Sequence, residues 1–213
     1  MPKIVEVKQR GMLSAAVAIT MTAAGAMGFG LWDLGQRRAA APAVVAVDKA
    51  SLADALDDAP WISSGGDRNA PILWLVTAPH CPACRVFEQR TLPTLLDKGV
   101  EVRVILVAPR ESALPGGEAE AIAGMARRRD WLALHTWMAG GVDRSAIALE
   151  AAAAEGYLEW GRASYDRISR AVERNGLKMA TPAVFWRMGL EWRAGVRPDG
   201  RAVAHLRRDL IQE

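Results

Sequence analysis

Apolar and polar residues follow one another in patterns that predict a strand, a helix and a second strand in the middle of the chain. Residues 70–78, APILWLVTA, form a short and almost wholly apolar run of strand length. Apolar residues then recur at helical spacing over 84–99, up to a glycine typical of a helix C-terminus, and Pro93 predicts a break within that helix. Residues 100–109, VEVRVILVAP, predict a buried strand parallel to the first. Together these segments predict a β-α-β unit.

The second half of the chain predicts helices followed by a hairpin. Residues 111–175 are rich in alanine and carry no strand signal, so they predict a helical insertion. PAVFWRM and EWRAGV, after Gly176, predict two antiparallel strands, and GRAVAHLRRDL predicts a closing helix with one apolar face. The order β-α-β, helices, β-β-α predicts an α/β protein with the thioredoxin fold and a helical insertion in its middle.

The N-terminal segment predicts attachment to a membrane. Residues 11–32 contain no charge and are long enough to cross a hydrocarbon core of about 30 Å as a helix. We therefore expect a tail at 1–10, an anchor at 11–35, a linker with a short helix at 36–60, and the thioredoxin-like domain at 61–213. Basic residues outnumber acidic ones before the apolar run, which predicts a cytoplasmic tail and an exported domain.

A cleaved secretory signal is the alternative interpretation of this segment. The sequence RRAAAPA supplies small residues, but the apolar run exceeds the roughly 7 to 15 residues of a usual signal core. Pro42 is also unfavourable for cleavage after Ala41. The length argument favours an uncleaved anchor, and both interpretations export residues 40–213.

Composition indicates a globular protein without a nucleic-acid partner. Hydrophobic residues make up 51% of the 213 residues and charged residues 24%. The formal net charge of +3 gives no broad basic surface, so we expect no binding to nucleic acid.

The chain has two cysteines, Cys81 and Cys84, at the junction between the first strand and its helix. A structural disulfide over so short a loop would constrain almost nothing. A structural zinc site needs four ligands, and the three histidines are isolated from one another, so metal binding is the less favoured alternative. Redox exchange remains, and we expect no metal and no cofactor other than the redox-active disulfide itself.

The position of the pair predicts different roles for the two thiols. Cys81 precedes the helix, where free backbone N–H groups and the helix dipole stabilise a thiolate, so it is the expected attacking group. Cys84, one turn inside, is the expected resolving thiol. Pro82 suits the first helical turn, and with Ala83 it lies between the thiols, where both are candidates for tuning their reactivity. His80 either adds positive charge when protonated or is a solvent-facing loop residue.

Two motifs carry a resemblance to a known family. Cys81-Pro82-Ala83-Cys84 lies at a strand-to-helix junction, and residues 176–183, GLKMATPA, precede the final hairpin. In this combination the chain resembles the bacterial periplasmic Dsb thiol-disulfide oxidoreductases, with the catalytic domains of DsbC and DsbG as the more similar branch. The resemblance implies that Cys81 is the nucleophile, that Cys84 resolves the mixed disulfide, and that Thr181 and a cis Pro182 face the disulfide and hold a substrate backbone.

The resemblance also implies partners and a location. It predicts exchange with exported cysteine-containing proteins, and a membrane redox partner that reoxidises or reduces the protein. It places the chain in the bacterial inner membrane, with a single pass and the C-terminal domain in the periplasm.

Two departures from the family limit these expectations. Leu75 occupies the position where thioredoxin and DsbA have a buried carboxylate, so no acid-base helper is evident from the sequence. Only a linker and a short helix separate the expected anchor from Trp61, so we expect no dimerisation domain of the DsbC type. A tethered oxidase or reductase is therefore favoured over an isomerase. The alternative is a non-catalytic binding module that serves envelope assembly, secretion or metal delivery.

Overall fold

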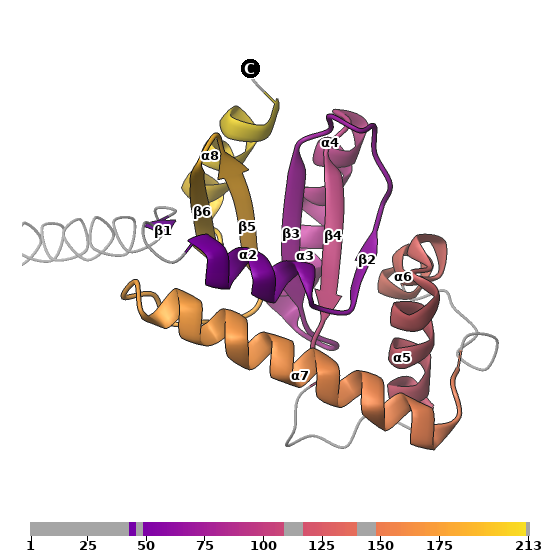
Figure 1. Ribbon diagram of the computed structural model, residues 1–213. Coiled ribbons are helices and arrows are strands. Elements are labelled where there is room, and N and C mark those ends of the chain that lie inside the picture. Colours follow the sequence, from indigo (N-terminus) through magenta and orange to yellow (C-terminus); the bar gives the residue numbers. More distant parts are fainter. Residues whose placement is uncertain (1–42, 46–48, 109–116, 140–147, 212–213) are drawn as a thin grey trace, which may run out of the picture. The chain divides into compact units, whose positions relative to one another are not determined.

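The computed structural model describes residues 43–45, 49–108, 117–139 and 148–211 (Figure 1). The expected tail and membrane anchor lie outside these residues. None of the helices within the described ranges is both long and apolar enough to cross a membrane.

A mixed sheet of six strands forms the centre of the fold. The central strand β3 pairs in parallel with β4 and antiparallel with β5. Strand β6 pairs antiparallel with β5, and the short antiparallel strands β1 and β2 close the two edges, in the order β1-β6-β5-β3-β4-β2. The bounds are β1 (Ala43–Val45), β2 (Trp61–Ser63), β3 (Ile72–Thr77), β4 (Glu101–Leu106), β5 (Ala183–Met188) and β6 (Glu191–Val196).

Helices cover both faces of this sheet. The described helices are α2 (Lys49–Asp57), α3 (Pro82–Arg90), α4 (Leu92–Asp97), α5 (Glu118–Arg128), α6 (Trp131–Met138), α7 (Ala151–Glu173) and α8 (Gly200–Ile211). Because side chains alternate along a strand, Leu73 and Leu75 of β3 pack with α3, α4, α5 and α8. Trp74 and Val76 pack on the other face with α2 and α7, which run along the lower end of the sheet in Figure 1.

The observed element order confirms the expected thioredoxin fold with a helical insertion. The unit β3-α3-β4 is followed by α5, α6 and α7, and then by β5-β6-α8. The helix expected over 84–99 is divided at Thr91 into α3 and α4, and Pro93 lies in the first turn of α4. A proline is tolerated there because the first turn of a helix does not need its N–H group.

The short helix expected within residues 36–60 is present as α2. Helix α2 packs against α7, since Leu52 and Leu56 are fully buried beside Ile168 and Val172. Residues 40–213 form one compact unit. The strands β1 and β2 were not predicted, because three residues are too few to show a periodic pattern.

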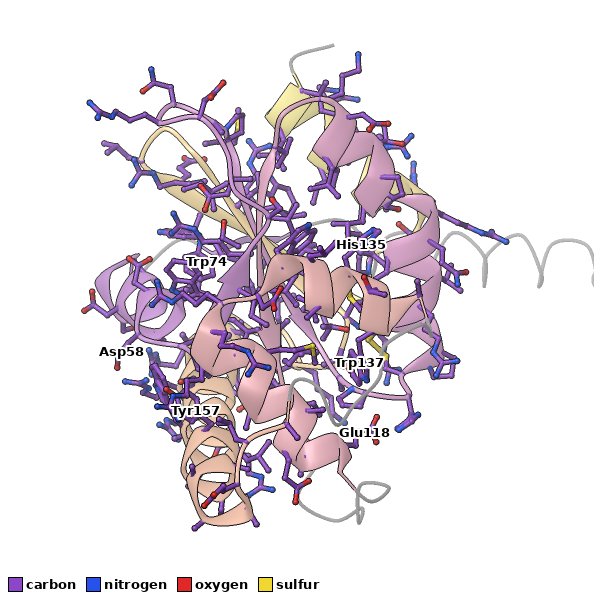
Figure 2. All side chains as sticks on the ribbon, turned by 90° about the vertical axis from the view of Figure 1, so that its right-hand side faces the viewer. Asp58, Trp74, Glu118, His135, Trp137 and Tyr157 are labelled. Carbon is purple, nitrogen blue, oxygen red and sulfur yellow. A yellow bond between two sulfur atoms is a disulfide. The ribbon has the colours of Figure 1, made fainter. Side chains whose placement is uncertain are left out.

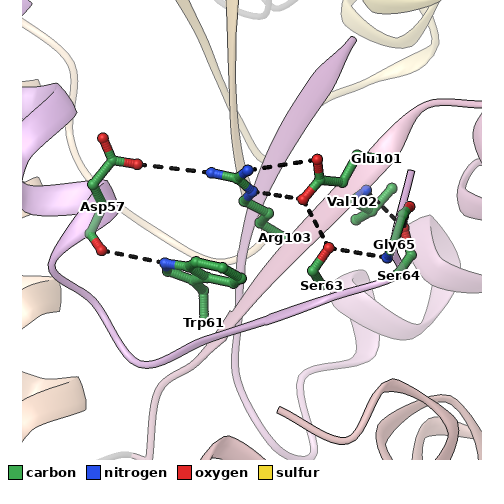
Figure 3. Close-up of polar contacts among 8 residues, drawn as sticks. All are labelled: Asp57, Trp61, Ser63, Ser64, Gly65, Glu101, Val102 and Arg103. Atoms are coloured by element: carbon green, nitrogen blue, oxygen red, sulfur yellow. Dashed lines mark hydrogen bonds and ion pairs between the residues drawn. The ribbon is translucent and has the colours of Figure 1, made fainter. Parts of the chain in front are cut away.

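An aromatic and charged cluster holds the helical insertion to strand β2. The guanidinium of Arg103 lies 4.8 Å from the centre of the Trp61 ring, and its Nε donates to Glu101 at 2.8 Å (Figure 3). The indole N–H of Trp61 donates to the carbonyl oxygen of Asp57 at 3.2 Å. Arg129, at the end of α5, lies 4.0 Å from the centre of the Trp61 ring. Trp61 thus contacts cations from both the sheet and the insertion.

Replacing Trp61 by Leu should destabilise the fold, because it removes both cation–π contacts and the indole hydrogen bond. We expect the free energy of unfolding to fall by roughly 1–3 kcal/mol, measured by urea denaturation followed by circular dichroism. Leu190→Ala is the matched control, since Leu190 is 79% exposed and its loss should change little. Equal stability of the Trp61 variant and the control would contradict the anchoring role.

Candidate active site

Strand pairing brings the two predicted motifs together. In the antiparallel pair of β3 and β5, Val76 lies opposite Ala183, so the end of β3 meets the start of β5. Cys81 follows β3, and Thr181 precedes β5. The hydroxyl of Thr181 donates to the sulfur of Cys81 at 3.6 Å, and the Thr181 carbonyl oxygen is 3.8 Å from the same sulfur. The peptide bond between Thr181 and Pro182 is cis, as expected.

Cys81 and Cys84 form a disulfide at the N-terminus of α3. Cys81 is the N-cap residue, and its sulfur accepts a hydrogen bond from the backbone N–H of Cys84 at 3.2 Å. Cys81 is half-buried, whereas Cys84 is only 2% exposed. Pro82 and Ala83 are exposed between them. A thiolate on Cys81 would keep the N–H contact, which favours the charged form of that sulfur.

His80 connects the active-site loop to the helical insertion. Its backbone has a positive φ of 58°, and its Nε2 lies 2.9 Å from a carboxylate oxygen of Glu118. The His80 side chain is 51% exposed, whereas the Glu118 side chain is 1% exposed at the start of α5. The His80 side chain therefore both faces solvent and contacts a buried carboxylate, which agrees with either interpretation of this residue. Sequence analysis missed Glu118, because nothing local in the sequence indicates a partner 38 positions away.

A cleft of about 260 Å³ lies beside the disulfide. The loop after β3, helix α3, the end of β4 and the helical insertion form its walls. Its lining includes Cys84 and Glu88 from α3, and Glu118, Trp137 and Met138 from the insertion. Figure 2 labels Glu118 and Trp137 on the two insertion helices α5 and α6. Cys84, the buried cysteine of the pair, therefore borders a cleft that polar side chains also line.

Glu88 is a second carboxylate on this cleft that sequence analysis missed. It lies on α3 four residues after Cys84 and accepts a hydrogen bond from the Thr77 hydroxyl at 2.9 Å. Burial raises the pKa of Glu88 above its ordinary value, against the lowering effects of the Thr77 hydrogen bond and of Arg85. Leu75 is fully buried, so the strand itself offers no carboxylate.

The described residues contain no group of three or more histidine, cysteine, aspartate or glutamate side chains placed to hold a metal ion. The described groups that can take part in chemistry at this site include the disulfide, the hydroxyl and carbonyl of Thr181, and the carboxylates of the cleft.

No protein-family model matches the chain, and no curated protein sequence matches it. Its fold is similar to that of the thiol-disulfide exchange protein α-DsbA2 from Wolbachia pipientis, with a TM-score of 0.49, 14% identity, and coverage of 79% of this chain and 96% of that one. Proteus mirabilis ScsC in a transitional conformation gives a TM-score of 0.46 at 18% identity, over 98% of this chain and 95% of that one. A periplasmic thioredoxin-like protein from Salmonella enterica serovar Typhimurium gives a TM-score of 0.46 at 14% identity, over 76% of this chain and 94% of that one. At these identities and TM-scores, function has to be argued from the site of this chain itself.

The burial of the two thiols predicts an order of modification. When the disulfide is reduced, iodoacetamide should alkylate Cys81 first, because Cys84 is only 2% exposed. Because the helix N-terminus and the backbone N–H of Cys84 stabilise a thiolate on Cys81, its labelling should already be fast near neutral pH. Peptide mass spectrometry across a pH series measures both effects. Faster labelling of Cys84 would contradict the assignment of roles.

Proposed function

We propose that this protein is an enzyme, a thiol-disulfide oxidoreductase that exchanges disulfides with cysteine-containing proteins. The observation that carries the proposal is the disulfide at the N-terminus of α3, with one half-buried sulfur in contact with Thr181 and one buried sulfur behind it. A structural disulfide would not need a helix N-terminus that favours the thiolate of one partner.

In the oxidising direction, a substrate thiolate attacks the sulfur of Cys81. The bond between Cys81 and Cys84 breaks, and Cys84 leaves as a thiolate that takes up a proton. A second substrate thiolate then attacks the substrate sulfur of the mixed disulfide, which releases Cys81 as a thiolate. The substrate has lost two electrons, and the enzyme dithiol has gained them.

In the reducing direction the same steps run backwards. The Cys81 thiolate attacks a substrate disulfide and forms the mixed disulfide, while the other substrate sulfur leaves as a thiolate. Cys84 then loses its proton and attacks Cys81, which releases the substrate and restores the enzyme disulfide. Both directions use the same geometry, and a membrane redox partner would return the enzyme to its starting state.

The loop around Thr181 and Pro182 is proposed to hold the substrate chain beside Cys81. The Thr181 carbonyl lies 3.8 Å from the reactive sulfur, at the point where β5 begins. An extended peptide placed here would bring its own cysteine next to Cys81 while its main chain pairs with the loop.

We also propose that residues 11–35 tether the enzyme to the bacterial inner membrane, with the catalytic domain in the periplasm. The uncharged apolar run and the basic residues before it support this orientation. Exported proteins that acquire disulfides in that compartment would then be the substrates.

Replacing Cys84 by Ala should trap substrates on Cys81, because no resolving thiol remains. The variant is incubated with an unfolded, partly oxidised substrate protein, and adducts are detected by electrophoresis without reductant. Cys81→Ala is the matched control and should form no adduct. An absence of adducts with Cys84→Ala, together with a wild-type protein that exchanges no disulfides with glutathione, would favour the binding module instead.

A further inference from the structure

The segment between β6 and α8 lies beside the proposed substrate loop, Thr181-Pro182. In the pair of β5 and β6, Val196 is opposite Ala183, so the end of β6 meets the start of β5. The backbone N–H of Arg197, the next residue, donates to the carbonyl oxygen of Pro182 at 2.8 Å. This hydrogen bond fixes the backbone of Arg197 next to the residues that are proposed to hold the substrate chain.

The backbone of Arg197 has a conformation that favours glycine. Its φ is 48°, in the left-handed region that residues with a side chain rarely adopt. The hydrogen bond to Pro182 uses only backbone atoms, so glycine at this position could make it equally well. The turn itself therefore does not explain why an arginine is present, and an unfavourable backbone conformation of this kind is a reason to look for a function of the side chain.

The other two non-glycine residues with a positive φ in the described chain have partners for their side chains. The ring of His80 contacts a carboxylate oxygen of Glu118 at 2.9 Å, and the guanidinium of Arg129 lies 4.0 Å from the centre of the Trp61 ring. Arg197 is exposed, and no hydrogen bond or ion pair joins its side chain to another residue within the described ranges. Its guanidinium is thus available to a molecule that binds at the proposed substrate loop.

We infer that Arg197 binds a carboxylate of the substrate chain, so that the enzyme prefers cysteines with an aspartate or glutamate about two or three residues away. The inference rests on the proposed function and adds the class of substrate to it. Arg197 determines specificity in this account: it contacts the substrate away from the reacting sulfurs and takes no part in the exchange of the disulfide.

The expected spacing follows from the chain of contacts between the sulfur and Arg197. The carbonyl oxygen of Thr181 is 3.8 Å from the sulfur of Cys81. Pro182 follows Thr181 and accepts the hydrogen bond from Arg197. An extended substrate chain advances about 3.3 Å per residue, so a side chain about two or three positions from its cysteine reaches the level of Arg197.

The charges near this loop favour an acidic substrate. Lys178, ahead of the loop in the sequence, and Arg201, in the first turn of α8, are further exposed cations. Asp199 lies between Arg197 and Arg201 in the sequence, but its carboxylate already accepts the backbone N–H groups of Arg201 and Ala202. An incoming carboxylate therefore meets more positive than negative charge here.

The cleft beside the disulfide has a different character. Its lining contains the carboxylates of Glu88 and Glu118, and Arg197 does not belong to its described lining. The cations of the cleft, Arg85 and His80, already lie beside these two carboxylates. A substrate carboxylate therefore gains more from the guanidinium of Arg197 than from this cleft.

The chemistry of arginine sets the size of the expected effect. The planar guanidinium can donate two parallel hydrogen bonds to one carboxylate. An ion pair at an exposed site nevertheless contributes little, and salt screens it further. We therefore expect a preference of about two- to fivefold in rate.

The test uses the full-length oxidised protein and synthetic peptides that each contain a single reduced cysteine. One series has an aspartate about two or three positions before or after the cysteine, and asparagine replaces it in the matched series. The second-order rate constant for loss of the enzyme disulfide is measured by acid quenching and mass spectrometry. Each rate is divided by that of the same peptide with hydroxyethyl disulfide, which corrects for the effect of the aspartate on its own thiol.

The wild-type protein should react about two- to fivefold faster with an aspartate peptide than with its asparagine partner, and salt at about 0.5 M should remove most of the difference. Arg197→Gln should abolish the preference and leave the asparagine rate unchanged, and Arg197→Glu should reverse it. Arg187→Gln is the matched control, because Arg187 is exposed at the other end of β5 and its loss should leave the preference intact.

Arg197→Gly gives a second variant in which the turn is retained, because glycine adopts the left-handed conformation readily. It should lose the preference as Arg197→Gln does. A preference that persists in both variants would overturn the inference. So would an equal slowing with both series of peptides, or a wild-type protein that reacts with both at the same corrected rate. Failure of the proposed function itself has a different signature, since the wild-type disulfide would then react with no peptide of either series.

Discussion

The antiparallel pairing of β3 with β5 is the constraint on which the site depends. It brings residues 100 positions apart into contact, because the end of one strand meets the start of the other. The register is fixed by burial on both faces: Phe185 and Trp186 are fully buried in different core clusters. A slip of one residue would send each of these side chains to the opposite face, and would move Thr181 away from Cys81.

The parts of this arrangement that could be predicted are those that the pattern of neighbouring residues in the sequence indicates. An apolar run followed by two cysteines and a helical pattern indicates β3 and α3 by itself, and the apolar segments after Pro182 indicate the hairpin. The resemblance of the motif at Thr181 added the expectation that the two regions meet. Each of these features needs only a few neighbouring residues to be visible.

The parts that could not be predicted depend on which side chains become buried when the helices pack against one another. Glu88 and Glu118 have the sequence context of ordinary exposed helix residues, and only the packing of the insertion against α3 turns them into the lining of a cleft. Helix α2 was expected in a linker, but Leu52 and Leu56 are buried once α7 lies beside them. Side-chain burial of this kind is a property of the tertiary fold, which periodicity within one segment does not report.

The two edges of the sheet, β1 and β2, are only three residues long. An exposed edge strand offers unpaired backbone groups to any extended chain, and a long one invites uncontrolled strand addition. A protein that meets partly unfolded chains would be especially exposed to this hazard. Edge strands this short can form few consecutive hydrogen bonds with an added strand. This limits strand addition by the partly unfolded proteins that are the proposed substrates.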